Sequence, residues 1–265
     1  MTTSSSNNRT LIIIAIVVAI VLICCCLAVV ALAASGVLSS VKAVTDMRME
    51  ASATVERSFD VTTPVTLKVR VNVGQVIVKV GEGDTVRISA VKRVWGQDRQ
   101  QAEDYLADVQ IDIEQPQANR IEIQTVIPAR LNRLGRTPSV DLEIWVPRQT
   151  DLDLSTEVGG IEVTGVEGAF DVRTNVGDIT LRDAHLAGDS QLKTDVGSID
   201  LRLPANSAFT FRAQTDVGDI DLDFDVRNRR QDEQIVGGTV EGEVGDTPTV
   251  HLNLKTNTGD IDIRK

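Results

Sequence analysis

Cysteine, aromatic residues and positive charge are all scarce in this 265-residue chain. The only three cysteines, Cys24 to Cys26, are consecutive and lie inside an apolar run, which excludes a disulfide-stabilised scaffold. Aromatic residues make up 3% of the chain and the formal net charge is -11. A nucleic-acid-binding protein is disfavoured, because binding a polyphosphate needs a basic face. The 42% apolar content is too high for a disordered chain, and the length allows one or two domains.

Residues 11–34 form an uninterrupted apolar segment of 24 residues without a charged residue, Gly or Pro. As a helix it would reach about 36 Å, enough to cross a hydrocarbon core of about 30 Å. We therefore predict a polar tail at 1–10, a single transmembrane helix at 11–34 and a juxtamembrane linker at 35–52. A cleaved signal peptide is the competing interpretation, because Ala31-Leu32-Ala33 has a small-x-small form. Against it, signal-peptide cores usually run only about 7 to 15 residues.

The charges beside this segment do not decide its orientation. Arg9 precedes the segment, whereas Lys42 and Arg48 follow it, and this bias mildly favours a cytoplasmic C-terminal domain. A short tail, one long apolar segment and a large C-terminal domain are nevertheless the usual layout of a signal anchor. We expect a single-pass protein of the cell membrane whose C-terminal domain lies outside the cytoplasm.

One pattern, Thr-x-Val-Gly-x-Ile-x-Val/Leu, recurs five times within residues 151–265, with Thr258 in place of Val in the last copy. The copies share a threonine and a glycine: Thr156, Thr174, Thr194, Thr215 and Thr256, with Gly159, Gly177, Gly197, Gly218 and Gly259. The glycines are 18, 20, 21 and 41 residues apart, so the period is about 20 residues. The last interval holds either two rungs or one rung and an insertion near residues 227–245. A fixed period of this size is typical of a solenoid.

Apolar and polar residues alternate on both sides of each glycine, which predicts β-strands. The parity changes across the glycine, so a corner there would keep both strands facing one interior. We predict an all-β fold, a single-stranded parallel β-solenoid with about 20 residues per coil, whose successive coils stack about 4.8 Å apart. The inward residues of one coil would be Phe170, Val172, Thr174 and Val176 before the glycine, with Ile179 and Leu181 after it.

Residues 53–150 read as an irregular β opening of the same domain. Val71 to Val78 is a degenerate copy of the repeat. The segment from Asp98 to Val109 predicts one short helix, because Ala102, Leu106 and Val109 share a face and Asp98 is a candidate N-cap. This region would cover the first coil, since an exposed parallel strand templates aggregation. Strands are expected near 85–93, 109–115, 120–127 and 140–146.

The repeats and the final Gly259-Asp260-Ile261-Asp262-Ile263 resemble the bacterial putative-adhesin family of β-strand-repeat domains of unknown function. The resemblance covers about residues 55–265. Members typically carry such a domain after a membrane segment, and some resemble products of cell-envelope stress operons. The resemblance implies a parallel β-solenoid at the cell surface and supplies no catalytic residues.

Polar side chains on equivalent outward positions would form ladders if the coils stack in sequence. One ladder would hold Glu157, Asn175, Asp195, Asp216 and Asn257, and another Gly160, Asp178, Ser198, Asp219 and Asp260. Neighbouring carboxylates repel, and Ca²⁺ could bridge them through hard oxygen ligands. The favoured interpretation is instead that these side chains accept hydrogen bonds from turn N–H groups, without a cofactor. The residues of the calcium alternative are Asp178, Asp195, Asp216, Asp219 and Asp260.

An enzyme is a second alternative, because parallel β-helices include polysaccharide-active enzymes. The cluster it would use is Asp195, Asp216, Asp219 and Arg212. Sugar clefts, however, use aromatic platforms, and Phe170, Phe209, Phe211 and Phe224 all have core parity. His185 and His251 are 66 residues apart with no serine or cysteine motif nearby. We therefore expect no catalytic residues and no small-molecule substrate.

Two tryptophans lie in the opening region. Trp145 is expected to be half-buried, whereas Trp95 beside Gly96 could offer a partner contact at a strand end.

These observations favour a non-catalytic, membrane-anchored surface protein, an adhesin or envelope scaffold. Its partners would be the membrane, through residues 11–34, and a protein or surface polymer. The 16 acids and 5 bases at 151–225 disfavour anionic partners unless divalent cations bridge them. The alternative is an accessory or sensor protein of a cell-envelope stress signalling system.

Overall fold

The computed structural model describes residues 49–133, 137–233 and 236–265, which belong to one compact unit, Arg48–Lys265. The predicted tail, the predicted transmembrane helix at 11–34 and most of the predicted linker lie outside the described residues. Strand β1 (Met49–Asp60) begins within the range assigned to the linker. Within the described ranges, no helix has both the length and the apolar character needed to cross a membrane.

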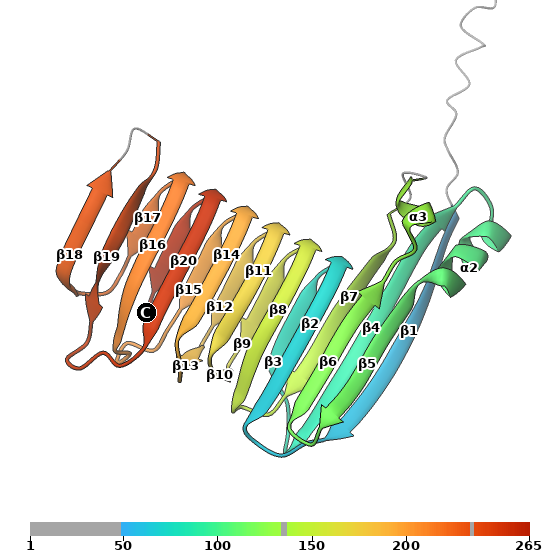
Figure 1. Ribbon diagram of the computed structural model, residues 1–265, viewed down its shortest axis with the longest axis horizontal. Helices are drawn as coiled ribbons and strands as arrows, with labels where there is room; N and C mark the ends of the chain where they lie inside the picture. The colour runs from blue at the N-terminus through green and yellow to red at the C-terminus, as the bar shows by residue number, and fades with distance from the viewer. Residues whose placement is uncertain (1–48, 134–136, 234–235) are drawn as a thin grey trace, which may run out of the picture. The chain divides into compact units, whose positions relative to one another are not determined.

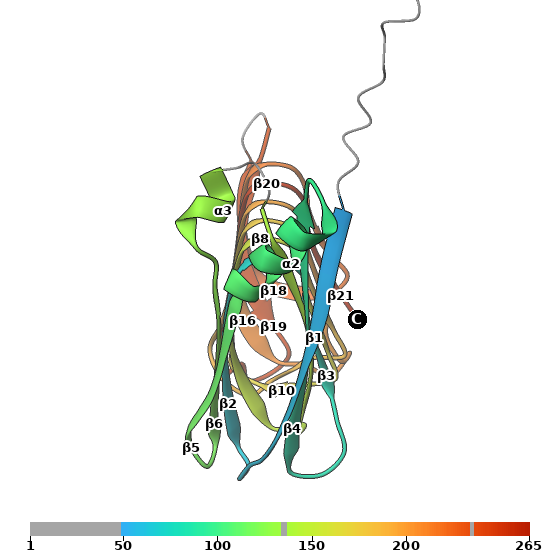
Figure 2. The same cartoon turned by 90° about the vertical axis from the view of Figure 1, so that its right-hand side faces the viewer.

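Two long sheets face each other and enclose the core (Figures 1 and 2). The nine-stranded sheet has the spatial order β1, β4 (Thr85–Gly96), β7 (Ser139–Val146), β3 (Val76–Val80), β9 (Ile161–Thr164), β12 (Ile179–Arg182), β15 (Ile199–Arg202), β21 (Ile261–Arg264) and β17 (Ile220–Leu222). The ten-stranded sheet has the order β18 (Val226–Glu233), β19 (Gly238–Val244), β16 (Phe209–Val217), β20 (His251–Thr258), β14 (Ser190–Val196), β11 (Phe170–Val176), β8 (Thr150–Val158), β2 (Val65–Val73), β6 (Arg120–Val126) and β5 (Gln110–Gln117). A small third sheet pairs β10 (Glu167–Gly168) with β13 (His185–Leu186).

Each copy of the repeat forms one coil, with a strand of the ten-stranded sheet before the glycine and a strand of the nine-stranded sheet after it. Alternate side chains of both strands point inward, so Ile179 and Leu181 are fully buried, as are Phe170 and Val172. The predicted all-β solenoid with parallel pairing is therefore the architecture of the repeat region. We name each coil by its corner glycine. The degenerate copy forms such a coil as well, from β2 and β3 around Gly74.

The coils do not stack in the order of the sequence. Strand β20 lies between β14 and β16, and β21 lies between β15 and β17. The last coil of the chain, that of Gly259, is therefore inserted between the coils of Gly197 and Gly218 (Figure 1). The sequential stacking that we expected is wrong at this place. The 41-residue interval holds one coil and an insertion, the antiparallel hairpin β18–β19.

Antiparallel strands cover the two ends of the parallel stack. At the N-terminal end, β1, β4 and β7 pair antiparallel, and β5 pairs antiparallel with β6. The predicted strands of this region are β4, β5, β6 and β7. The predicted helix is α2 (Arg99–Asp108), and the carboxylate of Asp98 caps it by accepting from the Gln101 amide at 2.8 Å. A second short helix, α3 (Ala129–Arg133), and strand β1 had no clear periodic signal.

Candidate interaction surface

The corner glycines form a column in which each backbone lies directly against the next. The φ angles of Gly159, Gly177 and Gly197 are 144°, 148° and 145°, a region that only glycine enters readily. A Cβ atom on Gly177 would lie 2.1 Å from the Gly159 carbonyl oxygen, and one on Gly197 would lie 2.0 Å from the Gly177 oxygen. The invariant glycine of the repeat therefore serves both the turn and the close stacking of coils.

A row of buried threonines lies behind the glycine column. All five repeat threonines are at most 3% exposed, as their parity indicates. The Thr194 hydroxyl donates to the Gly177 carbonyl at 2.9 Å, and the Thr256 hydroxyl donates to the Gly197 carbonyl at the same distance. Thr174 and Thr215 make the equivalent bonds to Gly159 and Gly259. Each threonine thus binds a carbonyl of the preceding coil in the stack.

We expect Thr194→Val to lower the free energy of unfolding by about 1 kcal/mol, because it leaves the partly buried Gly177 carbonyl without its donor. Thr180→Val is the matched control, since Thr180 lies half-buried on the outer side of β12 and should change stability by less than about 0.5 kcal/mol. Urea unfolding of both variants measures the difference. Equal stabilities would show that the buried hydroxyl contributes nothing.

The polar residue after each glycine binds the neighbouring coil. The carboxylate of Asp178 accepts from the Ser198 amide at 2.8 Å, and the Ser198 hydroxyl accepts from the Asp260 amide at 3.2 Å. The Asp260 carboxylate in turn accepts from the Asp219 amide at 2.9 Å. These side chains make the turn hydrogen bonds of the favoured interpretation.

The inserted coil changes the ladders on which the calcium alternative rests, because it separates Asp195 from Asp216 but leaves Asp260 beside Asp219. Ser198 lies between Asp178 and Asp260, and Asn257 lies between Asp195 and Asp216. The Asn257 amide donates to the Asp195 carboxylate at 3.3 Å. Among the described residues, no three His, Cys, Asp or Glu side chains come together in a way that could hold a metal ion.

Two of the four residues of the enzyme alternative, Arg212 and Asp195, lie beside other charged side chains. Arg212 forms an ion pair with Glu241 of the hairpin, and Asp195 lies 3.7 Å from the Lys193 amine. His251 lies beside the Thr210 hydroxyl at 3.0 Å, whereas His185 belongs to the small third sheet. The four phenylalanines are buried, with Phe209 packed edge-on against Phe224 at 5.6 Å between ring centroids.

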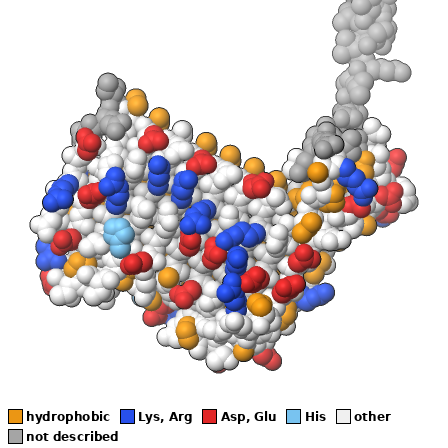
Figure 3. All heavy atoms as spheres, in the orientation of Figure 1, with side chains coloured by type: hydrophobic (Ala, Val, Ile, Leu, Met, Phe, Trp, Pro, Cys, Tyr) orange, Lys and Arg blue, Asp and Glu red, His pale blue; other side chains and the backbone are white. Residues whose placement is uncertain are grey.

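A row of exposed valines follows the outer edge of the corner, one residue before each glycine. The strands pair in register, so Val176 lies opposite Val158 on one side and Val196 on the other, and Thr258 lies between Val196 and Val217. Figure 3 shows hydrophobic side chains spaced along this edge. The exposed fractions are 46% for Val158, 47% for Val176, 50% for Val196 and 48% for Val217.

Our expectation that Val176 points into the core is therefore wrong. Its parity equals that of the buried Thr174, but the residue lies at the corner, beyond the end of the enclosed interior. The threonine hydroxyl already occupies the last inward position by binding the glycine carbonyl. The signal was present in the sequence, since Val recurs before the glycine in four of the five copies. The sequence pattern did not indicate at which residue the strand extends beyond the enclosed interior.

The outer face of the ten-stranded sheet carries charges of both signs beside the valine row (Figure 3). Arg173, Lys193 and Lys255 lie side by side on β11, β14 and β20. Arg173 pairs with Asp171 at 2.9 Å. The acidic excess at 151–225 is therefore not one uniformly acidic face, because Lys255, from outside that stretch, extends a basic row.

The outer face of the nine-stranded sheet has a comparable arrangement. The guanidinium of Arg264 lies 3.0 Å from Asp262 and 3.9 Å from Asp200. The hydrogen bond to Asp262, followed by the charges of Asp262 and Asp200, raises the pKa of Arg264. These exposed pairs contribute little to stability.

Both tryptophans are half-buried. The Arg87 guanidinium lies 5.7 Å from the centre of the Trp145 ring. Trp95 pairs with Glu50 of β1 and lies one residue before the end of β4 at Gly96, so its expected place at a strand end is confirmed.

Comparison with known proteins agrees with this architecture. The family described as Toastrack DUF4097 matches residues 60–264. The fold is similar to that of a putative cell adhesion protein from Clostridium sporogenes, with a TM-score of 0.51 and 13% identity over 82% of this chain and 99% of that chain. A putative adhesin from Bacteroides fragilis has a TM-score of 0.31 and 13% identity over 80% of this chain and 97% of that chain. No curated protein matches this chain.

Proposed function

The chain belongs to the Toastrack DUF4097 family of domains of unknown function, and from this premise we propose that it is a non-catalytic, adhesin-like binding protein. The solved structure from Clostridium sporogenes, which has a similar fold, is described as a putative cell adhesion protein, and this description supports the class. The apolar segment at 11–34 would anchor the protein in the cell membrane with residues 48–265 outside the cytoplasm.

The row of exposed valines is the observation that carries the proposal. Val158, Val176, Val196 and Val217 are about half exposed, so their packing in the core does not explain the recurrence of valine at this position. Thr258 occupies the same position in the inserted coil, which shows that the turn itself does not need valine. The coils hold the row rigidly at a spacing of about 4.8 Å. A regular apolar line flanked by charges suits a macromolecular partner.

We expect Val158→Thr, Val176→Thr and Val196→Thr together to reduce attachment by about tenfold, because each change removes roughly 0.5 kcal/mol of apolar contact. Threonine keeps the shape and strand preference of valine. The measurement is the retention of bacteria displaying the full chain on a layer of bacteria that lack it, and on purified cell-envelope polysaccharide.

Val80→Thr and Val126→Thr form the matched control. These valines are 37% and 39% exposed and lie away from the row. The control should attach as the unmodified chain does. Undiminished attachment of the triple variant, at equal surface display, would refute the proposed role of the row.

A further inference from the structure

The two sheets end differently at the C-terminal end of the stack. The ten-stranded sheet continues beyond β16 through the hairpin β18–β19, whereas the nine-stranded sheet stops at β17. The hairpin pairs with the Gly218 coil only up to the corner of that coil. The last of these contacts is at the corner itself, where the Gly218 amide donates to the Val236 carbonyl at 3.0 Å. Within the described residues, β17 has β21 as its only strand neighbour.

In every preceding repeat coil, the strand after the glycine binds the backbone of the next coil in the stack. In the described residues, β17 has no such neighbour on its outer side. The amides of Ile161, Ile179, Ile199 and Ile261 each donate at 2.9 Å to a carbonyl of the next coil in the stack. Ile220 is the equivalent residue of the Gly218 coil, and no next coil follows it in the described chain. Its outward N–H group is an unfilled place in a regular ladder.

The Asp219 side chain lacks its partner in the same way. In the three preceding coils the equivalent side chains of Asp178, Ser198 and Asp260 accept the amide of the neighbouring coil. Asp219 follows Asp260 in this series and, in the described part of the chain, has no further amide to accept. The Ile220 N–H group and the Asp219 carboxylate could thus both bind the backbone of one further strand beside β17.

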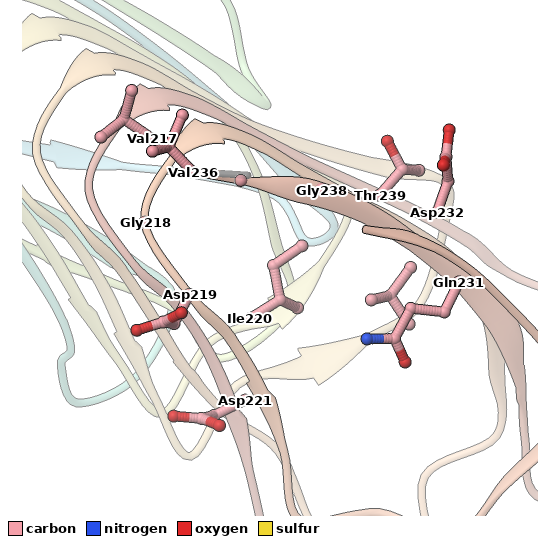
Figure 4. A pocket seen from close by; sticks show the side chains of 12 residues that line it. Val217, Gly218, Asp219, Ile220, Asp221, Gln231, Asp232, Val236, Gly238 and Thr239 are labelled. Atoms are coloured by element: carbon pink, nitrogen blue, oxygen red, sulfur yellow. The ribbon is translucent and has the colours of Figure 1, made fainter. Parts of the chain in front are cut away.

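The interior of the last coil is also open. Ile220 and Leu222 are partly exposed, whereas the equivalent residues Ile261 and Ile263 are fully buried. A cleft of about 580 Å³ lies between β17 and the hairpin, and Figure 4 shows Ile220 pointing into it. Val236 and Val240 of the hairpin side add to its apolar lining.

Three of the residues that line this cleft are aspartates. Asp219, Asp221 and Asp232 belong to its lining, and among the described residues none of the three forms an ion pair with Lys or Arg. In Figure 4 the carboxylates of Asp219 and Asp221 lie on the other side of the strand from Ile220. A strand added here would therefore present apolar side chains to the cleft and its alternate side chains to carboxylates.

We infer that the open edge of β17 binds an extended segment of a partner protein in which apolar and basic residues alternate. The segment adds one strand to the nine-stranded sheet. Its amide groups bind Asp219 and the β17 backbone, and its apolar side chains cover Ile220 and Leu222. Its lysine or arginine side chains neutralise Asp219 and Asp221.

A second copy of this chain fits this edge less well. The other long edge strand of the nine-stranded sheet is β1, whose exposed charges are Glu50, Glu56 and Asp60 against one arginine, Arg57. Two acidic edges repel each other. This surface differs from the valine segment substituted above, so the two proposals can fail separately.

The experiment measures binding of the full chain to a labelled peptide, Lys-Val-Lys-Val-Lys-Val-Lys, by fluorescence anisotropy. Two peptides serve as controls: one with glutamate in place of lysine, and one whose valine amides are N-methylated, which keeps charge and apolarity but cannot pair as a strand. We expect binding of the first peptide alone. We expect Asp219→Asn with Asp221→Asn to weaken it about fivefold, from two exposed charge contacts of roughly 0.5 kcal/mol each.

A matched variant, Asp84→Asn with Asp183→Asn, removes the same charge from exposed turns elsewhere and should bind as the unmodified chain does. Equal binding of the N-methylated peptide would overturn the inference, because attraction would then be electrostatic without strand addition. Equal binding of the glutamate peptide would overturn the basic preference. If the full chain self-associates and the lysine peptide disrupts this association, a second copy and not a partner segment occupies the edge.

Discussion

Gly159→Ala is expected to destabilise the folded protein by about 4 kcal/mol, from backbone strain and overpacking together. The φ angle of Gly159 is 144°, and an added Cβ atom would lie 1.9 Å from the Gly74 carbonyl oxygen. That oxygen belongs to the backbone of the preceding coil, so the contact cannot be relieved by rotating a side chain. The two coils would have to separate at this corner, with loss of their interstrand hydrogen bonds.

Gly160→Ala is the control at the adjacent residue. A Cβ atom there meets nothing closer than the Asp178 carbonyl oxygen at 3.5 Å, and other coils carry Asp or Ser at this position. We expect its free energy of unfolding to change by less than about 1 kcal/mol. Urea unfolding of the two variants under the same conditions gives the comparison. Similar losses at both positions would contradict the column of closely stacked glycines.

Removal of residues 250–265 is expected to detach the whole C-terminal part of the stack, and not just the deleted coil. The four inward side chains Leu252, Leu254, Ile261 and Ile263 are fully buried. At about 2 kcal/mol for each buried side chain, their loss approaches 8 kcal/mol, as large as the net stability of many domains. The coil of Gly218 and its hairpin would then lose the strands that join them to β14 and β15.

Limited trypsin digestion measures this effect at Arg212, which lies within β16. Cleavage there should become rapid in the shortened chain while the coils of Gly159 and Gly177 stay protected. A synthetic peptide of residues 250–265 should restore protection by filling the gap between β14 and β16. Continued protection of Arg212 without the peptide would mean that the Gly218 coil can stack directly on the Gly197 coil.

The local structure of a coil could be predicted from the repeat, because the residues of each copy determine the two strands and the corner between them. The alternation around Gly177 specifies two strands and their inward faces, and the glycine marks a turn that a larger residue would block. The helix at 99–108 was likewise predictable from its apolar face and the Asp98 cap. These are short-range effects, which depend on a few neighbouring residues.

The candidate site could be predicted from the sequence only in part. The threonines and the polar residues after the glycines have the roles that their positions indicate, but the exposure of Val176 depends on where the interior ends. The open edge at Ile220 depends on which coil is last in space, and that coil is not the last in the sequence. Adjacent carboxylates could be counted from the repeats only under an assumed stacking order.

The amino-acid pattern alone therefore dictates the coil, its corner and its inward face, since these follow from alternation, backbone sterics and hydrogen bonds within one repeat. Tertiary structure alone decides which coils are neighbours. Every copy offers almost the same backbone ladder and the same apolar interior, so local energetics barely distinguish one partner from another. Long-range packing decides which coils are neighbours. The hairpin β18–β19 pairs with one edge of β16 and covers the end of the ten-stranded sheet, and the last sixteen residues supply β20, which pairs with the other edge of β16.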